Sequence, residues 1–478
     1  MTANRASGAP SATATATAFA TTTAAAVRAG TLSARSAVQA SLDTIAATDS
    51  RVNAFTAVLA ERALKRADAV DLSPRRARMR LAGVPFAVKN LFDVAGIPTL
   101  AGSRIEATAA PARRDAVLLR RLEAEGAVLV GALNMDEYAY GFSTENSHAG
   151  ACHNPHELAR ISGGSSGGSA AAIAAGQVPL TLGSDTNGSI RVPSSLCGTY
   201  GLKPTYGRLP RTGSFPFVAS LDHLGPFARS VADLALCYDL LQGPDVDDPA
   251  CAQRSIETTT DSLDQGAIGV RVAVLGGWFR EMAQPEALSA VDRVAAALGT
   301  SRLVELPEVQ RARAAAFLIS CAEGGALHLP NLRTRADDFD PLTRDRFLAN
   351  ALVPAAWLVQ AQRVRHWFAR RVARAFQTVD LLIAPATPCT APLIGTEWLD
   401  IAGQRLPARP SLGLLTQPIS CIGLPVVTVP LWGCNPAAPH LPIGVQLIAA
   451  PWREDLCLRV AAALEAQGVC SAPVAQMG

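Results

Sequence analysis

Apolar runs of four to seven residues alternate along this chain with longer segments in which apolar residues recur at helical spacing. The short runs are bounded by Gly, Pro or charged residues, which is typical of buried strands, and they cover residues 84–88, 127–130, 270–275, 302–306, 380–384 and 443–449. The periodic segments predict helices at 33–45, 62–70, 115–126, 286–298, 355–376 and 454–467. Asp115 and Gly126 are the expected caps of the third of these helices. This alternation predicts an α/β fold with a single large mixed β-sheet core covered by helices on both faces.

The chain is expected to form one domain. Its length of 478 residues would allow three, but α/β enzymes often keep one large core, and 49% hydrophobic residues are enough to fill it. Residues 1–25, with the run SATATATAFATTTAAA, are expected to form a disordered tail. The domain then spans 26–478, and its first part, 26–75, is predicted to be all-helical.

Charge and cysteine content narrow the class of protein. The formal net charge is only +3 and the basic residues are scattered, so we expect no nucleic-acid partner and no membrane surface, but a small-molecule substrate. No apolar run approaches the roughly 20 residues of a membrane span. The ten cysteines have no regular spacing and are expected to be reduced and mostly buried. The N-terminus lacks the pattern of a secretory signal, so the predicted location is the cytoplasm.

Two Gly- and Ser-rich loops in residues 161–191 are the strongest candidates for chemistry. In ISGGSSGGSAAA, four glycines bracket Ser165 and Ser166, and the run 169–175 predicts a buried helix. After the apolar segment 178–182, the loop DTNGS brings successive N–H groups together, and such a nest can hold an oxyanion. The donors expected there are the N–H groups of Thr186, Asn187, Gly188 and Ser189.

These loops admit other interpretations. A phosphate loop needs Gly-Lys-Ser/Thr at the start of the helix, and a dinucleotide loop needs G-x-G-x-x-G directly after a strand. Neither pattern is met here. A flexible linker is also disfavoured, because it would not lead into an apolar helix. The residues 163–167 do satisfy G-x-S-x-G, so a serine hydrolase with a histidine base stays open as a competitor.

Lysine is rare in this chain. Lys65, Lys89 and Lys203 are the only three, against 40 arginines. Arginine stays protonated in proteins, whereas a buried lysine can lose its proton, so each remaining lysine is of interest. Lys65 lies in a charged helical segment and is expected to be solvated. Lys89 ends the apolar strand VPFAV, and the carboxyl ends of strands are the usual place for functional groups in an α/β sheet.

Two further groups of residues resemble functional sites but favour a structural role. His148, Cys152, His153 and His156 have no second ligand pair at zinc-module spacing, so we expect a polar loop beside the active site and no metal. Asp222 and His223 are adjacent, so they cannot easily orient one another as a catalytic base and its partner. We expect a surface turn there.

The chain resembles the amidase signature family. The resemblance lies in GGSSGGSAAA, GSDTNGSIR and VPSSLCGTYGLKPTYGR and extends over nearly the whole sequence. It implies the amidase signature fold and a catalytic triad of Lys89, Ser165 and Ser189, with a cis peptide bond before Ser165. It also implies no cofactor. TENSHAGACHNP, GGWFR, APATPCTAPLIGTEW, LLTQPIS and LPIGVQLIAAPW look especially like the carboxybiuret hydrolase branch, which acts in cyanuric acid breakdown.

The resemblance gives three functional expectations. The leading one is an amidohydrolase that converts 1-carboxybiuret to urea-1,3-dicarboxylate and ammonia. The alternatives are the glutaminase component of a tRNA-dependent amidotransferase, which is also similar, and a general amidase. Tyr140 and Arg346 are the candidates for binding the substrate, and Asp185 and Arg191 for supporting the oxyanion loop. A small helical partner subunit, resembling the C subunit of the tRNA amidotransferase, and a possible homodimer are further expectations.

Overall fold

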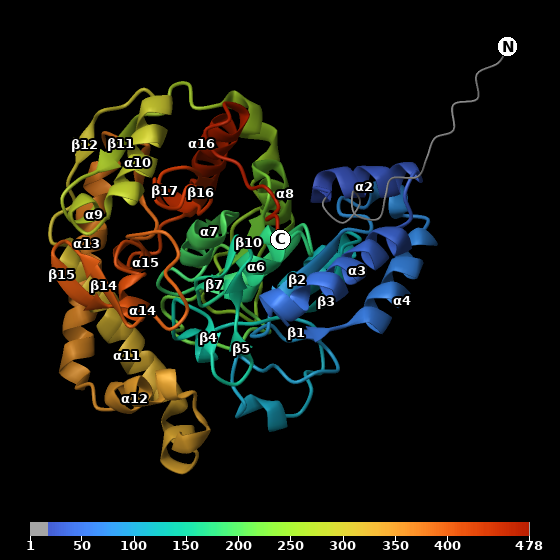
Figure 1. Ribbon diagram of the computed structural model, residues 1–478, viewed down its shortest axis with the longest axis horizontal. Coiled ribbons are helices and arrows are strands. Elements are labelled where there is room, and N and C mark those ends of the chain that lie inside the picture. The colour runs from blue at the N-terminus through green and yellow to red at the C-terminus, as the bar shows by residue number, and fades with distance from the viewer. Residues whose placement is uncertain (1–17, 478) are drawn as a thin grey trace.

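A mixed sheet of 11 strands runs through the computed structural model, which describes residues 18–477 (Figure 1). In spatial order the strands are β1 (Phe55–Val58), β3 (Val128–Leu133), β2 (Pro85–Lys89), β8 (Leu180–Asp185), β10 (His223–Ala228), β9 (Tyr200–Lys203), β16 (Val426–Leu431), β17 (Ile443–Ala449), β13 (Leu381–Pro385), β11 (Val272–Leu275) and β12 (Leu303–Val304). β2 runs parallel to β3 and β8, and β11 runs parallel to β12 and β13, while the other neighbours are antiparallel. The predicted single mixed sheet is therefore confirmed.

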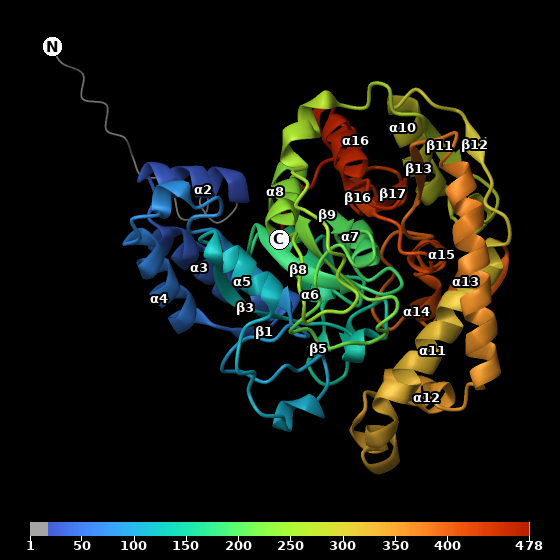
Figure 2. The ribbon, with the colours of Figure 1, turned by 180° about the vertical axis from the view of Figure 1, so that it is seen from behind.

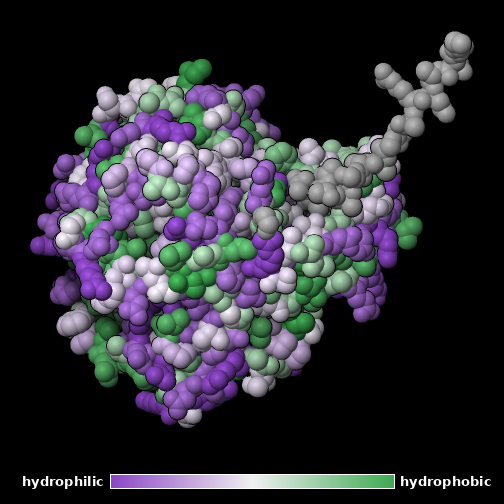
Figure 3. All heavy atoms as spheres, viewed as in Figure 1, coloured by the Kyte–Doolittle hydropathy of each residue, from purple (hydrophilic) through white to green (hydrophobic). Residues whose placement is uncertain are grey.

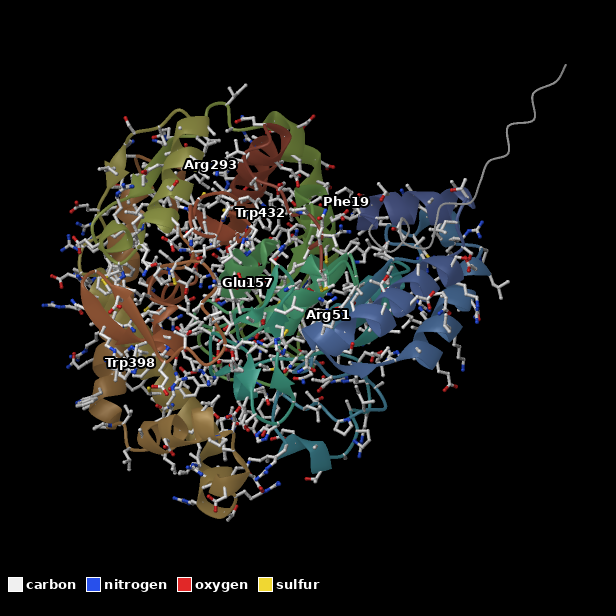
Figure 4. All side chains as sticks on the ribbon, viewed as in Figure 1. Phe19, Arg51, Glu157, Arg293, Trp398 and Trp432 are labelled. Atoms are coloured by element: carbon white, nitrogen blue, oxygen red, sulfur yellow. The ribbon has the colours of Figure 1, made fainter. Side chains whose placement is uncertain are left out.

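Three small hairpins lie outside this sheet. They pair β4 (Glu145–Asn146) with β5 (Gly150–Ala151), β6 (His153–Asn154) with β7 (Glu157–Ile161), and β14 (Trp398–Ile401) with β15 (Gln404–Pro407). Figure 4 shows Glu157 of β7 near the middle of the view and Trp398 of β14 near its edge. The first two hairpins precede the Gly- and Ser-rich loop that begins at Ser162.

Helices cover both faces of the sheet (Figures 1 and 2). On one face α3, α4 and α6 pack on the first half of the sheet, and α13 and α15 on the second half. On the other face lie α5, α8, α10 and α16. The helices are α2 (Ala20–Ala29), α3 (Ala34–Val52), α4 (Ala60–Asp71), α5 (Val117–Ala124), α6 (Gly167–Ala174), α7 (Arg191–Cys197), α8 (Val231–Leu241), α9 (Trp278–Glu281), α10 (Pro285–Ala297), α11 (Val309–Thr334), α12 (Pro341–Asn350), α13 (Ala355–Ala375), α14 (Ala408–Ser411), α15 (Gln417–Ser420) and α16 (Glu454–Ala466).

The pleat of the central strands explains the two cores. On β2, Phe86 and Val88 point into the larger core under α5, α8 and α16, whereas Ala87 points into the core under α3 and α6. Strand residues alternate between faces with a period of two, so a strand covered on both faces forms one continuous apolar run. This is why the strands at 84–88 and 443–449 could be predicted from the sequence.

The N-terminal part differs from the sequence prediction in two ways. Residues 20–25, expected to be disordered, form most of α2, whose Ala20 and Ala24 are buried in the larger core. The backbone N–H of Ala20 also donates to Asp233 on α8 at 2.8 Å. Residues 1–17 of the predicted tail lie outside the described residues. The predicted all-helical region also contains β1, an edge strand that pairs with β3.

One predicted helix cap is also wrong. α5 begins two residues after Asp115, with Ala116 at the cap position. The Asp115 carboxylate instead accepts hydrogen bonds from Arg62 of α4 and from the Ala95 N–H. It therefore joins α4 to the loop after β2.

The surface is mixed. On the face shown in Figure 3, hydrophilic side chains cover most of the area and hydrophobic ones gather in small groups.

All ten cysteines are buried and free, as expected. Within residues 18–477, the helices are all too short or too polar to serve as a membrane span.

Candidate active site

The carboxyl ends of two parallel strands place the first residues of the site. β2 ends at Lys89, and its parallel neighbour β8 ends at Asp185, with Val88 paired to Leu182. Parallel neighbours end at the same edge of a sheet, so Lys89 meets the residues that follow Leu182. The Lys89 Nζ donates to Ser184 Oγ at 2.9 Å and to Ser165 Oγ at 2.6 Å.

Ser165 lies in the loop that leads into α6. The peptide bond between Gly164 and Ser165 is cis. Gly164 has no room for a side chain, since a Cβ there would lie 2.1 Å from Oδ2 of Asp136. This close approach brings the buried Asp136 carboxylate behind the serine loop, where it accepts from the Ser143 N–H at 3.2 Å and from Arg409 at 3.3 Å.

Lys89 is completely buried. Burial lowers its pKa from 10.5 to about 7, and the carboxylates of Asp136, Asp222 and Asp185 only partly oppose this shift. Desolvation disfavours the charged ammonium, because the side chain has no direct ion pair among the described residues. At neutral pH the Lys89 amine is therefore neutral in about half of the molecules. An unperturbed lysine would be neutral in only about one molecule in 10³.

The loop after β8 carries Ser189 and is held by a buried ion pair. Arg191 donates to both carboxylate oxygens of Asp185, at 2.9 and 3.0 Å, and both side chains are fully buried. Burial alone would raise the pKa of Asp185, but the Arg191 guanidinium holds that pKa well below its usual range. Arg191 also donates to the Thr416 carbonyl, Gln446 and Ser420. The pair thus joins the end of β8 to the start of α7, on either side of the loop that carries Ser189.

The N–H groups of this loop are not all free to bind a ligand. Gly188 donates its N–H to Asp185 Oδ1 at 2.8 Å, so this donor is occupied within the loop. Gly188 also has φ +140°, and a Cβ would lie 2.1 Å from Thr416, so only glycine fits. The N–H groups of Thr186, Asn187 and Ser189 donate to no other group of the described residues. Three of the four expected oxyanion donors are therefore free among the described residues, and the Gly188 N–H is bonded to Asp185.

Ser189 lines a pocket beside the second Gly- and Ser-rich loop. Both predicted substrate-binding residues line this pocket, together with Thr186 and Asn187. The Arg346 guanidinium lies 3.6 Å from the centre of the Tyr140 ring and donates to the Tyr140 carbonyl at 3.0 Å. The Tyr140 hydroxyl is bonded to Asn350, so the ring and the carbonyl of Tyr140 orient Arg346.

Several residues of the site gave no signal in the sequence. Ser184 is the second partner of Lys89, and its position directly before Asp185 gave no separate signal. Arg313 of α11 and Gln417 of α15 line the Ser189 pocket but lie more than 120 residues after Ser189 in the chain. No sequence pattern links such distant segments, and the packing of α11 on α15 brings them together.

The surface turn predicted at Asp222 and His223 is wrong. They were expected in a surface turn, but Asp222 is 8% exposed and His223 3% exposed, and His223 begins β10. Asp222 accepts a hydrogen bond from the Thr186 hydroxyl at 2.6 Å and two more from the Phe217 and Val218 N–H groups. His223 Nδ1 lies 2.6 Å from the Leu221 carbonyl and 3.0 Å from the Asp185 carbonyl. Burial holds its pKa well below the usual range.

No histidine of the described residues hydrogen-bonds to Ser165 or Ser189. His148 faces Glu137, His153 faces the Leu158 carbonyl, His156 faces the Cys197 carbonyl and His440 faces Glu157. Across residues 18–477 no group of three or more His, Cys, Asp or Glu side chains is arranged to hold a metal ion. The arrangement around the serines is instead a buried amine that contacts one serine, beside a loop that presents a second serine and free N–H groups.

Comparison with known proteins identifies the class. The family model described as amidase matches residues 36–458, and the chain belongs to this family, whose members hydrolyse amide C–N bonds. A relative in Pseudomonas sp. (strain ADP), the AtzE chain of 1-carboxybiuret hydrolase, is 57% identical over 448 residues, which is 93% of this chain and 97% of the relative. The A chain of the glutamyl-tRNA(Gln) amidotransferase of Anaeromyxobacter dehalogenans (strain 2CP-C) is 39% identical over 475 residues, covering 92% of this chain and 94% of the relative.

Solved structures agree with this assignment. One, described as a vestigial protein complex that reveals the evolutionary origins of an s-triazine catabolic enzyme, has a TM-score of 0.93 and 56% identity, and the match covers 95% of this chain and 99% of that one. The crystal structure of an amidase has a TM-score of 0.84 at 30% identity over 94% of this chain and 100% of that one. The predicted amidase signature fold is thereby confirmed.

Proposed function

We propose that this enzyme hydrolyses the terminal amide of 1-carboxybiuret to give urea-1,3-dicarboxylate and ammonia. The observation that carries the proposal is the 2.6 Å contact between the buried Lys89 amine and Ser165, beside a loop whose Ser189 lines the pocket. The 57% identity to one chain of a 1-carboxybiuret hydrolase supports the choice of substrate.

In the first step Ser189 attacks the carbon of the terminal amide as its proton passes to Ser165, and the Ser165 proton passes to the neutral Lys89 amine. The new C–O bond makes a tetrahedral oxyanion, which accepts hydrogen bonds from the free N–H groups of Thr186, Asn187 and Ser189. The described residues show no hydrogen bond between Ser165 and Ser189, and the proposed proton transfer requires the two hydroxyls to come into contact when substrate binds.

In the second step the C–N bond breaks. The Lys89 ammonium returns its proton through Ser165 to the leaving nitrogen, which departs as ammonia and leaves an acyl group on Ser189. Water then attacks the acyl carbon, with Lys89 again taking a proton through Ser165, and this releases the new carboxylate and restores Ser189. The proposed steps use no cofactor and no metal.

The charge of the pocket separates the leading substrate from glutamine. In both molecules three atoms lie between the amide carbon and the carboxylate carbon, so length does not distinguish them. Glutamine carries in addition an α-ammonium group, which requires an acidic or carbonyl partner when it is desolvated. None of the described residues that line the pocket is Asp or Glu, and Arg346 adds positive charge. We infer that the pocket favours an anion over a zwitterion.

The alternative functions are the glutaminase component of a tRNA-dependent amidotransferase and a general amidase. The first is favoured by relatives at 39% identity. Ammonia release should be measured with carboxybiuret, biuret, glutamine and a simple aliphatic amide. Our proposal expects kcat/KM to be highest for carboxybiuret, and a preference for glutamine or for neutral amides would replace it with one of the alternatives.

We also propose a small helical partner subunit. The relative with 57% identity is itself one chain of a multi-chain enzyme, and a similar solved structure is a protein complex. The partner is expected to resemble the C subunit of the tRNA amidotransferase, and the large chain is also a candidate for a homodimer. Affinity purification from the native host, followed by mass spectrometry of short proteins, tests this. A chain that is fully active alone and unchanged by a co-expressed neighbouring small protein would contradict it.

We infer that the enzyme works in a reducing compartment, namely the cytoplasm. The support is that all ten cysteines are free and buried. Fractionation of host cells with an antibody against this chain tests the location.

A further inference from the structure

The Ser189 pocket contains a second guanidinium that the proposed reaction has not used. Arg313, on the second turn of α11, lines the pocket together with Arg346 of α12 and with Ser189. The two arginines come from different helices and reach the same cavity. No acidic side chain of the described residues faces them there.

The surroundings of Arg313 are unusual for a partly buried arginine of this chain. Arg62 pairs with the carboxylates of Asp115 and Glu123, and Arg211 pairs with Asp248. Arg121 donates to three backbone carbonyls. Arg313 donates from Nε to Oε1 of Gln417 at 2.9 Å, and within the described residues that is its one hydrogen bond.

This single neutral acceptor leaves the two Nη groups available. The contact with Gln417 also fixes the plane of the guanidinium, because Nε is the donor nearest to the side-chain stem. Burial lowers the pKa of Arg313, and no carboxylate opposes that effect. The guanidinium nevertheless stays protonated at any workable pH, so the protein keeps a positive charge at the pocket wall that no carboxylate of residues 18–477 pairs with.

We propose that Arg313 is a substrate-binding residue that, together with Arg346, forms an anion subsite and selects amides that carry a carboxylate three atoms from the amide carbon. This inference rests on the proposed function and names the residue that gives it its charge selectivity. A guanidinium and a carboxylate form charge-assisted hydrogen bonds, which are stronger than bonds between neutral groups. Gln417 acts as a positioning residue for Arg313.

Three stable compounds with the same carbon skeleton test the inference. Glutaramate has a terminal amide and a carboxylate at the spacing of carboxybiuret, glutaramide replaces that carboxylate with a neutral amide, and glutarate mimics the dicarboxylate product. Steady-state rates with the first two, and competitive inhibition by glutarate, should be measured for the wild type, Arg313→Gln and Arg313→Lys. The matched control is Arg311→Gln, because Arg311 lies on the same helix but is 72% exposed and paired with Glu308.

In Arg313→Gln we expect kcat/KM for glutaramate and carboxybiuret to fall about 10- to 100-fold, mainly through KM, with a similar rise in the inhibition constant of glutarate. The rate with glutaramide should change less than about threefold, since a neutral substrate gains little from the guanidinium. Arg313→Lys should recover part of the loss, and Arg311→Gln should match the wild type. An equal loss for glutaramate and glutaramide, or unchanged inhibition by glutarate, would overturn the role of Arg313.

The same data separate this inference from the proposed function. If the wild type binds glutarate through Arg313 but does not hydrolyse carboxybiuret, the anion subsite stands and the proposed substrate fails. If the wild type hydrolyses carboxybiuret at the same rate as Arg313→Gln, the proposed substrate stands and the subsite fails.

Discussion

The hydroxyl of Thr186 donates a 2.6 Å hydrogen bond to the buried carboxylate of Asp222. The other oxygen of that carboxylate accepts from the N–H groups of Phe217 and Val218. Phe217 lines the Ser189 pocket, so Asp222 joins the loop of free N–H donors to the wall of the substrate pocket. Asp222 is thus a positioning residue for the expected oxyanion donors.

This contact gives a prediction for Thr186→Val. Valine keeps the size of threonine but removes the hydroxyl, so the first donor of the loop loses its anchor. We expect kcat to fall about 10-fold with little change in KM, because donors that shift by a fraction of an ångström stabilise the transition state less. Thr186→Ser, which keeps the hydroxyl, is the control. Unchanged kcat in Thr186→Val would show that the loop is held without Asp222.

The Asp185–Arg191 pair predicts a stability effect. In Arg191→Met the Asp185 carboxylate stays buried and loses its cation, which should lower the free energy of unfolding by about 3–5 kcal/mol at pH 7. The folded-state pKa of Asp185 is depressed, so its contribution to stability is present at neutral pH and is lost as the pH falls below the usual range of an aspartate. Urea denaturation in a pH series from 7 down to 2 measures both effects. Equal stability of the variant and the wild type at pH 7 would contradict the account.

Ser189→Ala should abolish turnover and leave the fold intact. The loop has room for a smaller side chain, but the reaction loses the atom that attacks the amide, so we expect kcat/KM to fall at least about 10³-fold. Circular dichroism checks the fold, and mass spectrometry of the wild type stopped during turnover should find an acyl group on the peptide that contains Ser189. A covalent adduct on any other residue would refute this assignment.

Sequence reasoning predicted the sheet better than the details of the site. Strands such as β2 and β17 are buried on both faces and therefore appear as runs in which almost every residue is apolar. β10 was missed because it begins with His223 and contains Gly225 and Pro226, which are weak strand formers. β9 was missed for a related reason, since its four residues include Gly201 and Lys203.

The two serine loops and Lys89 could be found because they are local patterns or rare residues. Arg313 and Asp222 could not be found in this way, because the role of each depends on contacts with residues that lie far away in the chain or on another loop. A rule that places charged residues on the surface also failed at Asp222, whose burial is supported by three hydrogen bonds. Contacts of this kind depend on how helices and loops pack, which local patterns do not contain.

The low pKa of Lys89 predicts a trade-off between stability and activity. The folded protein holds this lysine with a pKa of about 7, whereas an unfolded chain has about 10.4, so the unfolded state binds more protons between these values. The contribution of Lys89 to stability is therefore most unfavourable below pH 7 and improves as the pH rises toward 10.

Replacing the lysine with an apolar residue of similar length removes this penalty. Lys89→Met should be more stable than the wild type at pH 6, by on the order of 3 kcal/mol after the loss of two hydrogen bonds is counted, and the difference should shrink at pH 9. Thermal unfolding at the two pH values is the measurement, with Lys65→Met as the control because Lys65 is exposed. A stability difference between Lys89→Met and the wild type that is equal at the two pH values, or larger at pH 9, would show that folding does not lower the pKa of Lys89.

The most direct test of the account is the pH profile of kcat/KM for the wild type and for Lys89→Arg. The wild-type rate should rise with pH and level off above an apparent pKa near 7, because the neutral amine is the base. Lys89→Arg keeps the positive charge but cannot accept the proton from Ser165, so its rate should be at least about 10³-fold lower at every pH. Single replacement of His148, His153, His156, His223, His328, His366 or His440 should reduce the rate far less. Near-normal activity in Lys89→Arg, or a comparable loss in one histidine variant, would contradict the lysine mechanism and point to a histidine base.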